Sequence, residues 1–216
     1  MEFFIYIHYN SVIGGRVVKA SMRLENSLRR EGHLFVCGID EVGRGCLAGP
    51  LVAGAVILPA NWKKPLKDSK MLTEAARIEL SEYVLQRSLA SGIGWVENSE
   101  IDLLGLTEAV KLAYLRALED MGSGFSLAVI DGNYNYLDEF GVAQTLVKAD
   151  QKMSCVAAAS IIAKVARDNY MREKSNEYNL YDFENNVGYG TKKHREAVAT
   201  YGITPLHRKS FCRNLV

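Results

Sequence analysis

The sequence predicts an α/β protein with a mixed sheet of about five strands that is flanked by helices. Two observations carry this prediction. Short apolar runs, about the length of buried strands, alternate along the chain with longer segments of helical periodicity. Three of these runs lead to an aspartate at or just beyond their carboxyl end, which is the edge where α/β sheets bind their ligands.

Each expected strand is a short apolar run that is closed by a turn residue or an acid. The second run is rich in valine, isoleucine and alanine and ends at Pro59. The fourth run stops at the pair Asp131-Gly132. The five expected strands are residues 34–40, 51–58, 92–97, 126–130 and 144–147.

The expected helices are marked by their caps and by the spacing of their apolar residues. Thr73 is a candidate N-cap for the first helix. Ser99 is a candidate N-cap for the second, with Asp102 at its third position as an acidic variant of the capping box. Gly202 ends the last helix. The expected helices are residues 73–89, a stretch that follows 99, 107–121, 152–176 and 192–201.

The length of 216 residues fits one domain, or one domain with an appendage. We expect residues 1–33 to be an N-terminal extension of unknown role and residues 34–216 to form the domain. The net charge of +1 gives no global signal for a nucleic-acid partner. From residue 152 onward, however, eleven Lys and Arg stand against six Asp and Glu, an excess of five. This third can present a basic face to a polyanion, although a solvated surface is the commoner meaning.

The four cysteines, Cys37, Cys46, Cys155 and Cys212, contain no C-x-x-C pair. This spacing disfavours a disulfide framework or a zinc site and is typical of small buried side chains in a reducing compartment. No apolar run approaches the ~18 residues of a membrane span, and the start of the chain lacks the basic region of a signal peptide. We therefore expect a cytoplasmic protein that has no membrane partner.

Four acids stand where expected strands end. Asp40, Asp131 and Asp150 each lie at or just beyond a strand end, and Glu41 follows Asp40. Carboxylates that gather at neighbouring strand ends repel each other and raise each other's pKa. Mg²⁺ or Mn²⁺ relieves that repulsion and prefers oxygen ligands. We therefore predict that Asp40, Glu41, Asp131 and Asp150 are catalytic metal ligands, although a single Asp-Gly pair is more often a plain turn.

Asp40 and Glu41 are consecutive, so in a regular strand their side chains face opposite sides of the sheet. Only one of them can point directly at the metals unless the strand is already turning. We expect Asp40 to be the central ligand. Glu41 is expected to contribute from a bent backbone, by its side chain or by its carbonyl.

Three further candidates concern substrate binding. Gly43-Arg44-Gly45 lets the backbone approach a ligand and places a guanidinium between two glycines, although such a pattern alone is more often a turn. Gly188-Tyr189-Gly190 is followed by cations and suits stacking on a sugar or base, or equally a packing plug. Ser160, Lys164 and Asp168 lie one turn apart on a helix. Lys164 can reach phosphate, but surface support is the commoner role for these three.

Seven blocks in order make the chain resemble ribonuclease HII, the bacterial type 2 ribonuclease H, from about residue 34 to residue 211. They are residues 39–50, 68–70, 131–132, 148–152, 158–168, 188–194 and 207–211. Where this family usually has Lys-Gly-Asp, the chain has Lys148-Ala149-Asp150. The Gly-Arg-Gly block also separates the chain from the type 3 relatives, which carry a different turn.

The resemblance implies a ribonuclease-H-like catalytic domain over residues 34–216 and a divalent-metal endonuclease. Such an enzyme would cut the RNA strand of RNA–DNA hybrids, and it would cut duplex DNA 5′ to a single embedded ribonucleotide. The ends would be 3′-hydroxyl and 5′-phosphate. The four acids would hold two Mn²⁺ or Mg²⁺ ions roughly 4 Å apart. The expected partners are these nucleic acids, and the expected state is a monomer.

Matching the motifs also implies which residues recognise the substrate. Gly43, Arg44 and Gly45 would read the 2′-hydroxyl at the junction, and Tyr189 would lie against the following deoxyribose. Because the 2′-hydroxyl is what distinguishes RNA from DNA, this contact is of the right chemical kind.

Two other functions remain open from the residues alone. The first is a nucleic-acid-binding module on the same fold that does not cut, and the presence of all four acids speaks against it. The second is a different metal-dependent enzyme on an α/β sheet, such as a Holliday-junction nuclease or a 3′–5′ nuclease. Such enzymes lack the two glycine-rich blocks.

Overall fold

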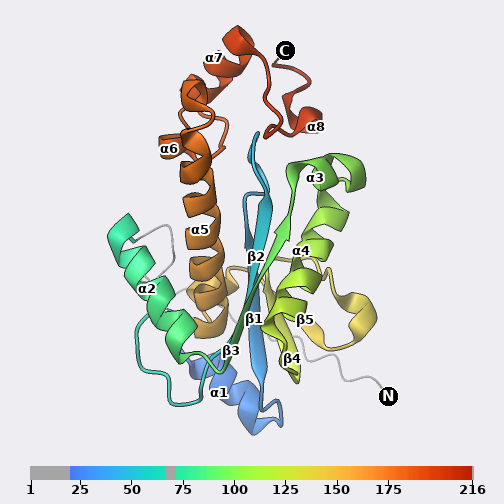
Figure 1. The fold of residues 1–216 in the computed structure, drawn as a ribbon. Coiled ribbons are helices and arrows are strands. Elements are labelled where there is room, and N and C mark those ends of the chain that lie inside the picture. Colours follow the sequence, from blue (N-terminus) through green and yellow to red (C-terminus); the bar gives the residue numbers. More distant parts are fainter. Residues whose placement is uncertain (1–19, 67–71, 216) are drawn as a thin grey trace, which may run out of the picture.

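A five-stranded mixed sheet forms the centre of the computed structural model, which describes residues 20–66 and 72–215 (Figure 1). The strand order is β3-β2-β1-β4-β5. The first three strands pair antiparallel, while β4 and β5 continue the sheet in parallel beside β1. The predicted α/β class and the mixed sheet of five strands are therefore confirmed. The strands are β1 (Val36–Val42), β2 (Leu51–Ile57), β3 (Ala90–Val96), β4 (Leu127–Asp131) and β5 (Ala143–Leu146).

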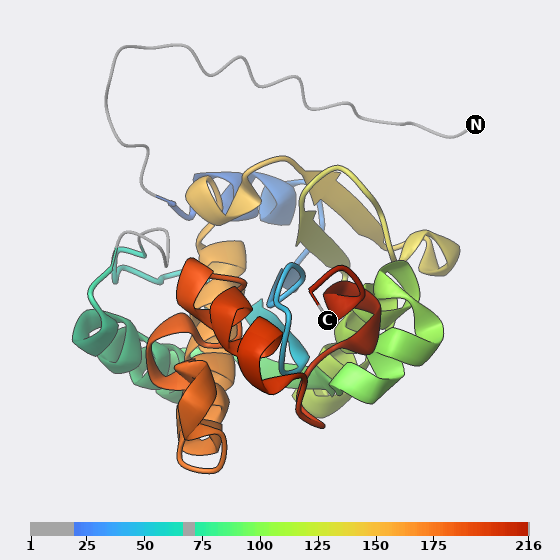
Figure 2. The same ribbon diagram turned by 90° about the horizontal axis from the view of Figure 1, so that it is seen from above.

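Helices cover both faces of the sheet and also the region beyond one of its ends (Figures 1 and 2). One face carries α1 (Arg23–Arg30), α2 (Glu74–Arg87) and α5 (Ser154–Ser175). The opposite face carries α3 (Asn98–Leu104) and α4 (Leu106–Met121). Beyond the carboxyl end of β1 lie α6 (Phe183–Asn186), α7 (Lys192–Tyr201) and α8 (Lys209–Cys212).

The element boundaries follow the sequence pattern closely. Each expected strand is present, and its ends differ from the expected ones by two residues at most. Thr73 caps α2 by accepting a hydrogen bond from the Ala76 amide, and Gly202 follows the last residue of α7. These predictions are confirmed. They could be made from the sequence because each depends on residues that are close together in it.

The predicted cap at Ser99 is wrong. The N-cap of α3 is Glu97, whose side chain forms a reciprocal capping box with Glu100. Asp102 instead accepts hydrogen bonds from the Lys209 and Ser210 amides, at 2.8 and 2.9 Å, at the start of α8. A carboxylate that was assigned to a local cap therefore ties α3 to a segment about a hundred residues away.

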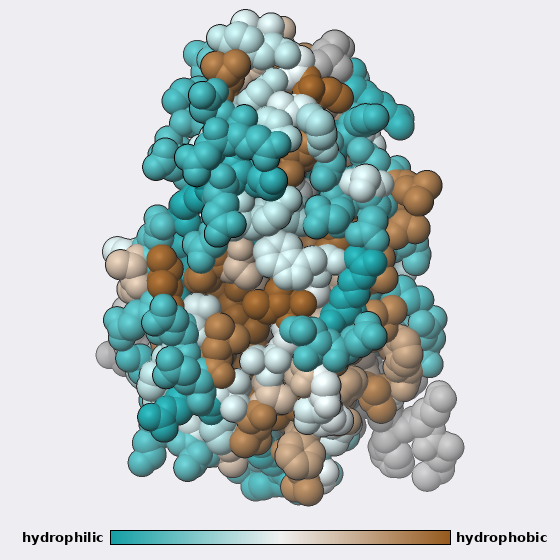
Figure 3. Space-filling model, viewed as in Figure 1, coloured by the Kyte–Doolittle hydropathy of each residue, from teal (hydrophilic) through white to brown (hydrophobic). Residues whose placement is uncertain are grey.

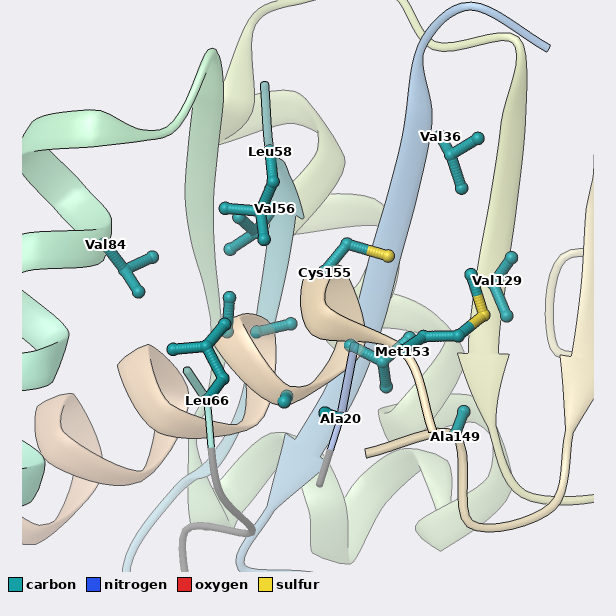
Figure 4. Packing of buried hydrophobic residues seen from close by; sticks show 14 of the residues in the cluster. Ala20, Val36, Val56, Leu58, Leu66, Val84, Val129, Ala149, Met153 and Cys155 are labelled. Atoms are coloured by element: carbon teal, nitrogen blue, oxygen red, sulfur yellow. The ribbon is translucent and has the colours of Figure 1, made fainter. Parts of the chain in front are cut away.

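The long helix α5 packs directly on β1. A side chain at Gly38 would overlap the backbone of Cys155 and Val156, so glycine is required for this close approach. Figure 4 shows Met153 and Cys155 of this region beside Val36 and Val129 of the sheet. The face of β1 toward α5 is thus filled by small residues and sulfur-containing side chains.

Residues 20–33 contribute to the same core. Ala20 and Leu28 are buried with the residues under α5, and Ala20 forms a bridge with Leu66. The buried Glu25 accepts a hydrogen bond from the Cys155 amide at 2.9 Å, in the first turn of α5. The division into an extension at 1–33 and a domain at 34–216 stays a prediction. The apolar run at residues 3–7 could form a strand from its sequence, but it lies outside the described residues, as does the block at residues 68–70.

The Lys148-Ala149-Asp150 departure causes no strain at its central residue. The left-handed backbone conformation falls on Lys148, with φ of 57°, and Ala149 is fully buried in the core. Because the alanine methyl group fills core space, the turn that carries Asp150 forms without a glycine there.

The molecule's outer surface is mainly polar on the side that Figure 3 shows, with hydrophobic residues in smaller patches. Within residues 20–66 and 72–215, no helix combines the length and apolar character that a membrane crossing needs.

A third apolar cluster, centred on Phe183 and Val198, holds α6 and α7 to the distal end of α5.

Replacing Gly38 by alanine is expected to destabilise the protein by about 1–3 kcal/mol, because the added methyl group overlaps the α5 backbone. Chemical denaturation of the two proteins measures this difference. Gly124→Ala is the matched control, since no atom lies within 4 Å of an added Cβ at that position. Equal stability of Gly38→Ala and the control would show that α5 tolerates displacement from β1.

Candidate active site

Asp40 and Asp131 end up side by side because β1 and β4 are parallel neighbours. Ile39 pairs with Ile130, so the next residue of each strand is an aspartate. The Ser160 hydroxyl of α5 is hydrogen-bonded to the Asp40 side chain. The parallel pairing therefore delivers two carboxylates to one end of the sheet, on the face covered by α5.

The Asp40 carboxyl lies in a strongly unfavourable environment for its charge. Burial raises the pKa of Asp40 well above its ordinary value, and the charge of Glu41 raises it further. Asp131 and Asp150 act in the same direction, while the hydrogen bond with Ser160 opposes the shift. These causes place all four predicted acids within electrostatic reach of one another.

Asp131 also builds the turn that carries Asp150. Its Oδ1 accepts a hydrogen bond from the Ala149 amide at 2.7 Å. This bond anchors the short 3₁₀ turn Ala149–Gln151, in which Asp150 is 6% exposed. The third aspartate thus reaches the site from a turn just before α5.

Glu41 points to the other face of the sheet. Its Oε2 accepts a hydrogen bond from the Tyr114 hydroxyl of α4, and its Oε1 lies 3.0 Å from Arg44 Nη1. Because neighbouring side chains on a strand alternate, the two consecutive acids are divided between α5 and α4. Tyr114 and Arg44 account for both oxygens of the Glu41 carboxylate.

The acids fit a divalent cation chemically, because all their donors are oxygen. In the described part of the chain, however, no three His, Cys, Asp or Glu side chains are grouped closely enough to hold a metal ion. Asp40 is hydrogen-bonded to Ser160, Glu41 to Tyr114 and Arg44, and Asp131 to the Ala149 amide.

The Gly43-Arg44-Gly45 turn rests on two buried arginines. Gly43 has φ of +91°, and any Cβ there would overlap the Arg167 side chain. Arg208 donates from Nη1 to the Arg44 carbonyl at 3.0 Å. Gly45, by contrast, has no atom within 4 Å of an added Cβ, so its face is open to a ligand. The half-exposed Arg44 side chain lies beside Tyr136, whose hydroxyl accepts from Nη2 at 3.1 Å.

The structure brings Tyr189 next to this turn. Tyr189 forms an antiparallel bridge with Cys46, and the Leu47 amide donates to the Gly188 carbonyl at 2.9 Å. The Tyr189 ring is 38% exposed. Two predicted substrate-binding blocks, separated by more than a hundred residues, therefore form one continuous surface.

Lys164 lies beneath the tyrosine. Its Nζ is 5.7 Å from the centre of the Tyr189 ring and 2.7 Å from Asp168 Oδ1. Asp168 is only 3% exposed, and Arg77 lies on its other oxygen at 3.9 Å. The expectation that these helix residues mainly support the surface is wrong for Asp168, because residues from α2 cover that face of α5. Ser160, from the same face, reaches Asp40 instead.

Three residues of this region were not predicted as functional: Tyr114, Arg167 and Arg208. Tyr114 shares an apolar helix face and gives no polar signal in the sequence. Arg167 donates to the carbonyls of Pro50, Val187 and Ala48, and it is fully buried. Arg167 and Arg208 both fall inside blocks of the family resemblance, at residues 158–168 and 207–211. Only the fold, however, shows that they donate hydrogen bonds to backbone carbonyls.

Replacing Asp40 by asparagine is expected to stabilise the metal-free protein. The folded state keeps a proton on Asp40 that the unfolded chain releases, so stability falls as the pH rises above the ordinary value of 3.8. Asparagine removes this penalty. At pH 7 the variant should therefore have a higher Tm than the wild type. In a domain of this size, each 1 kcal/mol of added stability raises Tm by about 2–4 °C. The difference in Tm should vanish near pH 4.

Thermal denaturation with chelator at several pH values measures this difference. Glu82→Gln, which changes an exposed acid on α2, is the control and should leave Tm unchanged. A Tm of Asp40→Asn below that of the wild type at pH 7 would contradict the electrostatic account.

The chain is similar along most of its length to proteins of one known family. The family model described as ribonuclease HII matches residues 37–214. The chain is 44% identical to the ribonuclease HII of Listeria monocytogenes over 195 residues, which cover 90% of this chain and 74% of that protein. It is also 44% identical to the ribonuclease HII of Bacillus subtilis over 188 residues, or 87% of this chain and 73% of that protein.

The fold has a counterpart among solved structures. The crystal structure of ribonuclease H2 from Pyrococcus horikoshii superposes with a TM-score of 0.70 at 26% identity, covering 84% of this chain and 96% of that one. The family model spans both the acid cluster and the Tyr189 loop. The chain belongs to the ribonuclease HII family and is a ribonuclease H, a hydrolase with an endonuclease's activity.

Proposed function

We propose that this protein cuts the RNA strand of RNA–DNA hybrids and also cuts duplex DNA on the 5′ side of a single embedded ribonucleotide. The ends would be 3′-hydroxyl and 5′-phosphate. The observation that carries this proposal is the bridge between Tyr189 and Cys46, the residue that directly follows the Gly43-Arg44-Gly45 turn and the acids of β1. The residues proposed to recognise the sugar and the acids proposed to hydrolyse the phosphodiester thus lie next to each other.

The turn offers groups that match a 2′-hydroxyl. Gly45 leaves its backbone open, and the Arg44 side chain is half exposed at the same place. A hydroxyl can both donate and accept, so it can bond with a backbone amide and a carbonyl together. The exposed Tyr189 ring offers a flat surface against which a deoxyribose can pack. DNA without a ribonucleotide would lack the first of these contacts.

We infer that Asp40, Glu41, Asp131 and Asp150 act with Mn²⁺ or Mg²⁺. Bound divalent ions would supply an activated water and neutralise charge on the scissile phosphate. The protein's own part is to orient the acids. Ser160 hydrogen-bonds to Asp40, the Ala149 amide holds Asp131, and Tyr114 holds Glu41.

Lys164 is also proposed to contribute to substrate binding. Its ammonium group supports the Tyr189 ring and is paired with Asp168, so its effect on phosphate is exerted from beneath the ring. The expected monomeric state and the cytoplasmic location stay predictions.

A single assay tests the proposed activity. A labelled DNA duplex with one ribonucleotide should be cut once, 5′ to the ribonucleotide, only when Mn²⁺ or Mg²⁺ is present. Asp40→Asn should lose at least about 1,000-fold in rate, about 4 kcal/mol of barrier, while its circular dichroism spectrum stays that of the wild type. Binding of the duplex without any metal-dependent cut would favour the module that binds but does not cut.

Loss of a residue of the recognition surface should reduce the enzyme's discrimination between substrates rather than its rate of phosphodiester hydrolysis. Arg44→Ala is expected to lower the preference for the single-ribonucleotide duplex over an all-DNA duplex by about tenfold, the value of one good contact, because it loses a contact with the 2′-hydroxyl. Tyr189→Ala is expected to lower the preference for the single-ribonucleotide duplex over an RNA–DNA hybrid by about tenfold, because it loses the contact with the following deoxyribose. Tyr189→Phe keeps the ring and is the matched control, which should retain the preference. An undiminished preference in Tyr189→Ala would remove this residue from the recognition surface.

A further inference from the structure

Two histidines lie buried between α7 and the segment that precedes α8. His194 is 0% exposed and His207 is 1% exposed. The ring of Phe183 lies 5.3 Å from that of His194, and the ring of Tyr181 lies 5.0 Å from that of His207. Both histidines come from blocks of the family resemblance, and the proposed function gives neither histidine a role. They belong to the part of the chain, around α7 and before α8, that lies beyond the sheet end in Figure 1.

The hydrogen bonds of Thr204 fix the proton of His207. The Thr204 amide donates to His207 Nδ1 at 3.0 Å, and a backbone amide can only donate, so Nδ1 carries no proton. The Thr204 hydroxyl also contacts Nδ1, at 2.8 Å, while its oxygen accepts from the Leu206 amide at 3.2 Å. A neutral His207 must therefore carry its proton on Nε2.

The same logic passes to His194. Its Nε2 lies 3.0 Å from His207 Nε2 and therefore accepts a hydrogen bond from the N–H group of His207. His194 in turn carries its own proton on Nδ1, which lies 2.9 Å from the Tyr189 carbonyl oxygen. Every bond from Thr204 to Tyr189 thus points in one direction.

We propose that His207 and His194 are positioning residues that form a directed hydrogen-bond relay to the Tyr189 carbonyl and thereby set the place of the Tyr189 ring. The inference rests on the proposed function in one respect, namely that Tyr189 contacts the substrate. The neighbouring Gly188 carbonyl accepts a hydrogen bond from the Leu47 amide at 2.9 Å. The relay and this bond together hold the loop against the Gly43-Arg44-Gly45 turn.

The direction of the relay is enforced by burial. Reversing one bond would put two donors or two acceptors face to face in a site closed to water, which is costly. A second proton on His194 would likewise meet the Nε2 proton of His207. In agreement, burial and the neighbouring His194 lower the pKa of His207 to about 4, and burial lowers the pKa of His194. Asp182, which favours a charged His194, is paired with Lys193 at 3.0 Å.

Nuclear magnetic resonance tests the relay directly. Long-range ¹H–¹⁵N spectra of the wild-type protein at pH 7 should show His207 protonated on Nε2 and His194 protonated on Nδ1, both neutral. Either opposite tautomer, or a charged ring, would overturn the proposal. This result does not depend on what Tyr189 binds.

Kinetics test the positioning role. His194→Phe keeps an aromatic ring and removes both bonds, and it should raise KM for the single-ribonucleotide duplex about tenfold, with kcat within about twofold of the wild type. His194→Asn can place its amide nitrogen where Nδ1 stood and should bring KM back to within about threefold. His33→Phe, at a half-buried histidine outside this cluster, is the control.

A milder variant covers the case in which His194→Phe does not fold. Thr204→Val removes the hydroxyl but keeps the amide that sets the direction, and it should raise KM about twofold. An unchanged KM in His194→Phe, or in Thr204→Val where His194→Phe does not fold, together with a raised KM in Tyr189→Ala, would overturn the relay as a positioning device. An unchanged KM in Tyr189→Ala would instead overturn the substrate role of Tyr189 and the positioning role with it, leaving the tautomers as they are.

Discussion

The close packing of α5 on β1 is the constraint on which the rest of the site depends. Gly38 lets the helix backbone approach the strand, and the same helix then carries Ser160 to Asp40 and Arg167 to Gly43. Its side chains Lys164 and Arg167 also lie beneath the Tyr189 ring, each 5.7 Å from its centre. One contact between a helix and a strand therefore aligns the acids, the recognition turn and the tyrosine loop.

The division of two consecutive acids between opposite faces gives the site its asymmetry. Asp40 joins Asp131 and Asp150 on the α5 side, where burial and mutual repulsion raise its pKa. Glu41 turns to Tyr114 of α4 and to Arg44 of the recognition turn. Because Glu41 bonds to that arginine, the acids and the turn are connected through a side-chain pair as well as through the backbone.

The segments after α5 serve the same surface from the far end of the chain. Arg208 holds the Arg44 carbonyl, and the two buried histidines lead from Thr204 to the Tyr189 carbonyl. Charge and hydrogen-bond direction, rather than apolar burial alone, decide how these segments dock. This explains why His194, His207 and Arg208 are buried although they are charged or titratable.

Local patterns in the sequence determined the strands, most helix ends and the position of the four acids near strand ends, because each depends on neighbouring residues. The metal-binding role of these acids stays a prediction. The apolar run before Asp40, the Thr73 cap and the Gly202 stop all appear where expected. Only the tertiary structure decided that Glu97 rather than Ser99 caps α3, that Asp168 is buried, and that Tyr114 holds Glu41. These outcomes depend on which distant segments come together, and strand pairing and helix packing fix that choice rather than any local pattern.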